Sequence, residues 1–174
     1  VLAVSFTMIC GSTGVAAAAT AAETQAAFVK TGDYLYRTTP QPTFSSIGGE
    51  WVIYGLANAG YEMSDAYLAA YQKEVEKVLT AGYRGVPGEF HDRATTDYSR
   101  VIMAYAAVGL DVTNVAGVNL LDAYACKERA LWQNMNGPIW VLASLDAGNY
   151  AIPQIKEGQE FGGKPATQNT RQAD

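Results

Sequence analysis

Three stretches of the chain share one pattern: EWVIYGLANAG (Glu50–Gly60), SRVIMAYAAVG (Ser99–Gly109) and GPIWVLASLDAG (Gly137–Gly148). Each is a short, nearly continuous apolar run that ends in glycine, a residue that tolerates the left-handed backbone conformation that closes helices. Aligned on that glycine, the position seven residues earlier holds Ile53, Ile102 or Val141. The glycines lie 49 and 39 residues apart, near the period of helix-pair repeats. The pattern therefore predicts an all-α chain built as an array of helices.

The three runs also share small residues near their ends. The positions five and one before the glycine hold Gly55, Ala104 and Ala143, then Ala59, Val108 and Ala147. Positions four apart lie one above the other on a helix, so we expect these helices to approach closely along this stripe. A helix that is apolar almost all round must be covered on both sides. We therefore expect an inner row of apolar helices.

Ser64–Ala81 has the pattern of an outer helix. Its apolar residues fall on one stripe, made by Leu68, Tyr71, Val75, Val78 and Leu79. The intervening positions are mostly Lys and Glu, as on a helix with one solvated face. Together with the inner row this predicts a two-layer array of α/α hairpins.

The remaining elements follow from start and stop signals. We expect further helices over Glu23–Tyr36, Ala116–Lys127 and Glu128–Gln133, and a loop over Tyr83–Arg93. Residues expected to cap helix N-termini are Ser45 or Ser46, Ser64, Thr95 or Thr96, Thr113, and Asn136 ahead of Pro138.

The two ends of the chain differ from its middle. Residues 1–19 combine the apolar run Val1–Ile9 with Ala16–Ala19, which is typical of the later part of a secretory signal peptide cleaved before Thr20. The alternative is a buried N-terminal helix. Residues 20–155 form the expected repeat domain, and residues 156–174 form a polar tail or the start of a truncated next repeat.

Composition excludes several function classes. The chain is 49% hydrophobic and 17% charged, which is too apolar for a disordered protein. A net charge of −5 and the lack of a basic run count against nucleic acid as a partner. No membrane insertion is expected once the signal peptide is removed. Cleavage would leave Cys126 as a lone thiol, more typical of packing than of catalysis.

The run from Glu50 to Pro153 resembles the prenyltransferase and squalene-oxidase repeat proteins, and in particular secreted forms found in Gram-positive bacteria. The resemblance rests on EWVIYGLANAGYEMSDAYLAAY, TDYSRVIMAYAAVGLDVTNVAGVNLL and WQNMNGPIWVLASLDAGNYAIP. It implies an α/α toroid, the fold also used by terpene cyclases, protein prenyltransferases and cobalamin carriers. The chain has fewer helices than a closed ring requires, so we expect a partial toroid from a longer protein, secreted or held at the cell surface.

The chain departs from the catalytic members of that family. It lacks the Asp-x-Asp-Asp acid motif of the cyclases and the Cys/His/Asp zinc ligands of the prenyltransferases. We therefore expect no metal, no cofactor and no catalytic residue. His91 and Asp92, in the long loop, are the only acid–base alternative.

Candidate binding residues gather near the predicted starts of the inner helices. They are Trp51, Asp97, Tyr98, Arg100, Trp132 and Asn136. Aromatic rings with a few polar groups are the usual lining of a ligand groove, and helix N-termini present free N–H groups. The structural alternative is that Asp97 caps a helix, Arg100 pairs with Asp97 or Glu50, and the tryptophans fill gaps.

Three functions remain open. The favoured one is a non-catalytic exported module that binds a ligand or partner in a toroid groove. The second is part of a terpenoid cyclase or prenyltransferase, and the third is a carrier resembling the cobalamin carriers. All three rest on the resemblance, and a shared fold does not establish a shared function.

Overall fold

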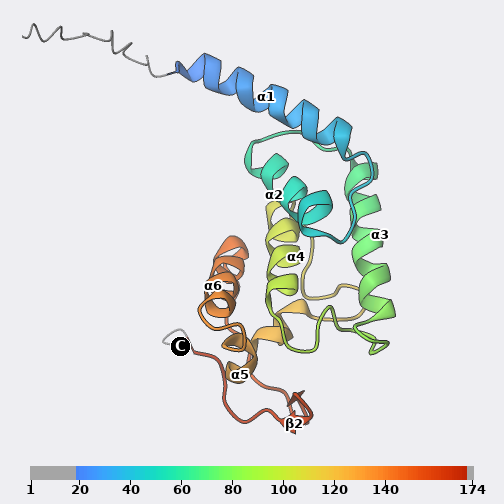
Figure 1. The fold of residues 1–174 in the computed structure, drawn as a ribbon, viewed down its shortest axis with the longest axis vertical. Helices are drawn as coiled ribbons and strands as arrows, with labels where there is room; N and C mark the ends of the chain where they lie inside the picture. The colour runs from blue at the N-terminus through green and yellow to red at the C-terminus, as the bar shows by residue number, and fades with distance from the viewer. Residues whose placement is uncertain (1–18, 172–174) are drawn as a thin grey trace, which may run out of the picture.

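The computed structural model describes residues 19–171, and they are mainly helical (Figure 1). The elements in chain order are α1 (Ala21–Thr38), the π-helical turn η1 (Ser46–Glu50), α2 (Trp51–Asn58), α3 (Asp65–Ala81), α4 (Thr96–Ala107), the 3-10 helix η2 (Leu120–Tyr124), α5 (Lys127–Ala130), α6 (Asn136–Gly148), β1 (Glu160–Phe161) and β2 (Lys164–Pro165). The predicted all-α class is confirmed, apart from one two-stranded hairpin. The predicted signal peptide lies outside the described residues, except for Ala19.

The core is centred on α4, which contacts both α2 and α6 (Figure 1). Every residue from Val101 to Tyr105 is buried. The position seven before each glycine is also buried: Ile53 and Ile102 are fully enclosed and Val141 is 2% exposed. These three aligned residues therefore share a core position.

The amphipathic helix α3 packs its apolar stripe inward. Tyr67, Tyr71, Val75 and Leu79, spaced four residues apart, are buried. Ser64 begins the helix as predicted, because its hydroxyl accepts a hydrogen bond from the Tyr67 N–H at 3.3 Å. The ring of Tyr71 meets that of Tyr105 at 6.0 Å and joins α3 to α4.

The glycine ends of the three runs are only partly alike. Gly60 and Gly109 take the predicted left-handed conformation, with φ of 68° and 72°. Gly148 instead remains inside α6, and Asn149 is the left-handed residue, with φ of 53°. Glycine is needed at 148 for another reason, since a side chain there would collide with the ring of Tyr150.

The expected close approach along the small-residue stripe is wrong. Gly55, Ala59 and Ala147 are exposed, and a side chain added at Gly55 would meet no atom within 4 Å. Only Ala104 among these positions is fully enclosed. The expected cover on both sides holds for α4 but not for α6, which leaves Ile139 and Leu142 about half exposed.

The predicted helix over Ala116–Lys127 is also wrong. Ala116 and Gly117 take positive φ and form a tight turn, in which Val115 and Val118 exchange backbone hydrogen bonds. The chain continues as η2, whose first turn is capped by the Asn119 side chain. A positive φ at a non-glycine residue interrupts any helix, and Ala116 carries no sequence signal for it.

Three of the predicted helix caps are not made by the side chains predicted to make them. The backbone N–H groups of Thr95 and Thr96 donate to Oε1 of Gln133, at 2.9 and 3.2 Å. The start of α4 is therefore capped by a residue from the segment before α6. Asn136 lies inside α6, whose N-cap position is Met135, and its side chain accepts a hydrogen bond from Trp140. The third predicted cap, Thr113, instead donates from its hydroxyl to Asp111 Oδ1 within a turn.

The C-terminal segment packs back onto the start of α5. Strands β1 and β2 form a short antiparallel hairpin, and a backbone bridge joins Cys126 to Asn169. The Thr170 N–H donates to the Ala125 carbonyl at 2.9 Å. Between residues 156 and 171 the structure has these two strands and no helix.

Candidate functional site

A charged cluster forms where α2 and α4 begin. Arg100 donates from Nη2 to Asp97 Oδ1 at 2.6 Å and from Nε to Glu50 Oε2 at 3.4 Å. Glu50 is completely buried, and the Tyr71 hydroxyl donates to its other oxygen at 3.4 Å. Burial raises the pKa of Glu50, and the positive charge of Arg100 opposes that rise. The buried Glu50 carboxylate therefore binds the Arg100 guanidinium from the interior side.

This geometry confirms the expected ion pairing and also keeps two groups near the surface. The side chains of Arg100 and Asp97 are 18% and 24% exposed. With both carboxylates ionised the cluster carries two negative charges and one positive charge. Their sum of −1 disfavours an anionic ligand.

An aromatic group lies beside the charged cluster. The indole rings of Trp51 in α2 and Trp140 in α6 have centroids 5.3 Å apart, and Tyr54 meets Trp51 edge-on at 6.1 Å. All three are partly exposed. The Trp140 Nε1–H donates to Asn136 Oδ1 at 3.1 Å, which fixes the orientation of the indole. We call Trp51, Tyr54 and Trp140 the aromatic platform.

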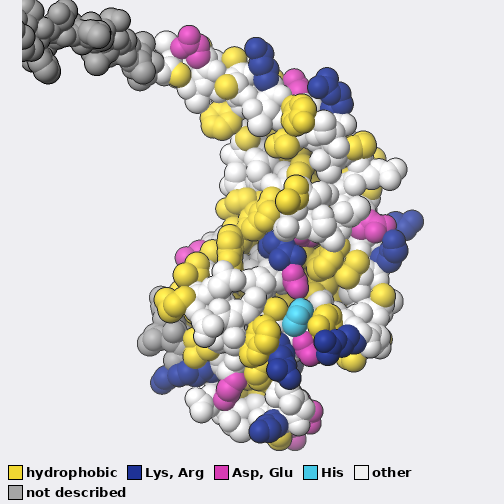
Figure 2. All heavy atoms as spheres, viewed as in Figure 1, with side chains coloured by type: hydrophobic (Ala, Val, Ile, Leu, Met, Phe, Trp, Pro, Cys, Tyr) yellow, Lys and Arg dark blue, Asp and Glu magenta, His cyan; other side chains and the backbone are white. Residues whose placement is uncertain are grey.

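Four of the six predicted binding residues belong to these two groups. Trp51 is part of the platform and Asn136 is bonded to it, whereas Asp97 and Arg100 belong to the charged cluster. The two groups are linked through Glu50, which binds Arg100 and directly precedes Trp51 in the chain. In Figure 2 a band of hydrophobic side chains runs over α2 and α6, with charged side chains of both signs beside it. Sequence reasoning missed Trp140 and Tyr54.

Tyr98 and Trp132 do not join these four. Tyr98 is buried, its hydroxyl accepts from the Phe90 N–H at 3.1 Å, and the Arg129 guanidinium lies 4.9 Å from its ring centroid. Trp132 is 45% exposed, with its ring 6.1 Å from that of His91. The expectation that all six residues share one site is wrong for these two, which belong to a second cluster around His91.

His91 has a structural role in its loop. Its Nδ1 accepts hydrogen bonds from the backbone N–H groups of Arg93 and Ala94, both at 3.0 Å, and its ring stacks on Tyr83. Asp92 Oδ1 lies 3.0 Å from the same nitrogen. This arrangement orders the loop before α4.

Cys126 is a packing residue, as expected. It is 1% exposed, and its thiol donates to Glu128 Oε2 at 2.9 Å. Burial raises the pKa of the thiol, and the bond to Glu128 adds to the effect. A thiol kept protonated in this way is a poor nucleophile.

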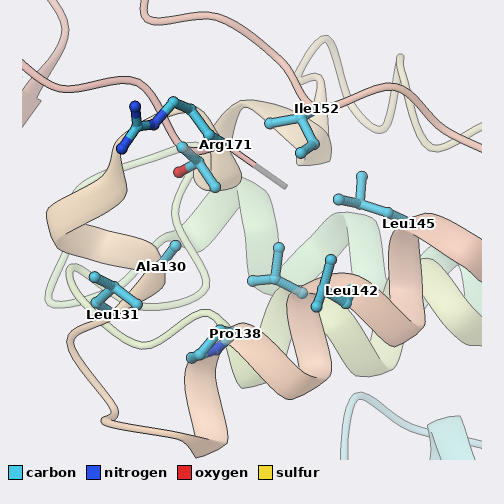
Figure 3. Close-up of a pocket in the computed structure, with 9 residues that line it drawn as sticks. Ala130, Leu131, Pro138, Leu142, Leu145, Ile152 and Arg171 are labelled. Carbon is cyan, nitrogen blue, oxygen red and sulfur yellow. The ribbon is translucent and has the colours of Figure 1, made fainter. Parts of the chain in front are cut away.

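A separate apolar hollow lies between α5, α6 and the C-terminal segment (Figure 3). Aliphatic side chains line it, including Leu131, Val141, Leu145 and Ile152, and Arg171 lies at its edge. The Thr170 hydroxyl, which also lines the hollow, is buried without a hydrogen-bond partner among the described residues. None of the six predicted binding residues lines this hollow.

Among the described residues, no group of three or more His, Cys, Asp or Glu side chains is arranged to hold a metal ion. Over the same part of the chain, no helix has the length and apolarity needed to cross a bilayer.

Comparisons with protein families, with curated proteins and with solved structures yield no match to this chain. The aromatic platform and the charged cluster are therefore interpreted from their geometry.

Proposed function

We propose that the chain is a non-catalytic, exported or cell-surface module of the α/α-toroid type, which binds a ligand where α2, α4 and α6 begin. The observation that carries the proposal is the contact of Trp51 with Trp140, together with the Arg100–Asp97 pair that is bound to Glu50, the residue before Trp51. These residues come from three helices far apart in the sequence. Partly exposed aromatic rings next to a few fixed polar groups are typical of ligand sites.

The arrangement of the helices supports the toroid part of the proposal. In a toroid, hairpins place one helix of each pair in an inner row and the other outside it. The contacts of α4 with α2 and α6 match an inner row, and α3 packs against α4 from its amphipathic face. In this assignment the helix N-termini of the row carry the binding residues.

The capping of α1 is compatible with the proposed cleavage before Thr20. Thr20, the residue after the proposed cleavage point, is the N-cap of α1, and with Glu23 it forms a reciprocal capping box. Cleavage before Thr20 would leave this cap intact. The leader itself lies outside the described residues.

The proposal that the module is non-catalytic rests on its polar groups. Nδ1 of His91 is engaged by backbone N–H groups, the Cys126 thiol is buried, and Arg100 is tied to two carboxylates. Each of these groups has a structural role that accounts for its position.

Indole N–H signals in a proton–nitrogen NMR spectrum test the proposal, since the chain has three tryptophans. A ligand of this site should shift the signals of Trp51 and Trp140 and leave that of Trp132 in place. The protein should turn over neither prenyl diphosphates nor squalene, with or without zinc or magnesium. Turnover would refute the non-catalytic assignment. Ligand-induced shifts confined to Trp132 would refute the location.

A further inference from the structure

The shape of the aromatic platform limits what it can bind. The rings of Trp51 and Trp140 are in direct contact, tilted by 47°, so no slot opens between them. A ligand therefore lies over the outward faces of the rings instead of being enclosed by them. An organic cation such as a quaternary ammonium is usually held in a cage of separated rings, which this geometry does not provide.

The charge beside the platform limits the ligand further. With both carboxylates ionised, Glu50 and Asp97 outnumber Arg100, which disfavours phosphates, nucleotides and carboxylates as ligands. The exposed polar groups are nevertheless varied: Asp97 offers acceptor oxygens and Arg100 offers N–H donors. Asn136 uses Oδ1 for Trp140 and keeps two N–H donors on Nδ2.

These groups are also held in place before any ligand arrives. Arg100 is bound by two carboxylates, one of them fully buried and also bonded to Tyr71. Trp140 is fixed by Asn136 and by contact with Trp51. Ordered side chains lose little conformational entropy on binding, which favours affinity for a ligand with many weak contacts.

A neutral pyranose ring matches both surfaces. One of its faces presents C–H groups that pack on an indole, and its edge carries hydroxyls that donate to a carboxylate and accept from guanidinium or amide N–H groups. We infer that the platform binds neutral sugar rings of a glycan, with Asp97, Arg100 and Asn136 hydrogen-bonding the hydroxyls. This inference rests on the proposed function and specifies its ligand.

The experiment is a titration of the protein with neutral oligosaccharides built from glucose, galactose, mannose, xylose or N-acetylglucosamine, followed by the three indole signals. At least one series should shift the signals of Trp51 and Trp140 in a saturable way. Trp140→Ala should weaken that binding about fivefold, which corresponds to the roughly 1 kcal/mol that a stacking aromatic contributes. Trp140→Phe should weaken sugar binding less than Trp140→Ala.

Trp132→Ala is the matched control, because Trp132 is also an exposed tryptophan but lies in the cluster around His91. It should leave sugar affinity unchanged. Asp97→Asn, which keeps the side-chain shape, should weaken binding, and thermal melts of every variant separate loss of binding from loss of folding.

Choline and inorganic phosphate serve as the other probes. If neutral sugars leave the two signals in place while choline or phosphate shifts them, the sugar inference is overturned and the ligand-binding module stands. If none of the probes shifts them and Trp140→Ala changes only stability, the inference is overturned and the proposed site loses its support as well.

Discussion

At the scale of single residues, two fully buried tyrosines on neighbouring elements have opposite hydrogen-bonding states. The hydroxyl of Tyr124 lies 2.9 Å from Ser99 Oγ and 2.8 Å from Ser144 Oγ, which links η2 to α4 and α6. The hydroxyl of Tyr105 is buried without a partner among the described residues. The hydrogen-bonded hydroxyl of Tyr124 should stabilise the fold, and the unpaired hydroxyl of Tyr105 should destabilise it.

Phenylalanine substitutions test this difference, since each removes only the hydroxyl. Tyr124→Phe should lower the free energy of unfolding by about 1–2 kcal/mol. Tyr105→Phe should be neutral or slightly stabilising, because it removes a polar group that has no partner. Urea unfolding followed by circular dichroism measures both. Equal destabilisation by the two variants would mean that Tyr105 also has a partner in solution.

Residue patterns predict part of the binding site and miss the rest for a definite reason. Trp51 and Arg100 share the position nine before a closing glycine, which in the third run gives Ile139. The left-handed residue of that run is Asn149, and nine residues before it stands Trp140. Val141 is buried, as the alignment on Gly148 would place it, whereas Trp140 is found only by counting back from Asn149. Which of the two residues ends the helix depends on the path of the chain after Gly148, and the sequence pattern does not show it.

At the scale of elements, two glycines associated with the helices have different roles. Gly82 ends α3 with φ of 71° and ψ of 165°, and a side chain there would overlap the Val86 carbonyl oxygen. This backbone conformation is essentially restricted to glycine. Gly55 has ordinary helical geometry within α2 and open space around it.

The two alanine variants should therefore change stability in opposite directions. Gly82→Ala should destabilise by about 2–3 kcal/mol through backbone strain and the clash. Gly55→Ala should stabilise by about 0.5–1 kcal/mol, because alanine loses less backbone entropy in a helix. Chemical denaturation of both variants checks the prediction. Destabilisation by Gly55→Ala would show that the small-residue stripe is packed after all.

Elements with strong periodicity are predicted well, and those set by distant contacts are not. The stripe of α3 and its Ser64 cap follow from local spacing. The start of α4 depends instead on Gln133, which lies almost forty residues further along the chain. The turn at Ala116 and Gly117 replaces a predicted helix, although alanine favours helices, because the turn brings Val115 and Val118 together.

At the scale of the whole molecule, burial by neighbouring elements decreases from α4 toward α1. The residues from Val101 to Tyr105 are enclosed by the core, whereas every residue from Ala21 to Lys30 is exposed. Figure 1 shows α1 projecting away from the other helices. Its second half is anchored, because Gly32 packs against the Tyr61 ring and Asp33 accepts from the Tyr61 hydroxyl at 3.0 Å.

Hydrogen exchange of the backbone amides should follow this gradient. Amides of Val101–Tyr105 should exchange most slowly, since they open only with the core, and those of Ala21–Lys30 should exchange fastest among the helices. A helix without tertiary contacts is marginal in water, even with the capping box at Thr20 and Glu23. Phe28 and Val29 are exposed apolar side chains on this helix, so protection of its amides would indicate a contact that covers them. Strong protection of Ala21–Lys30 that weakens on dilution would show that another copy covers this helix. Protection independent of concentration would show instead that α1 packs against its own chain.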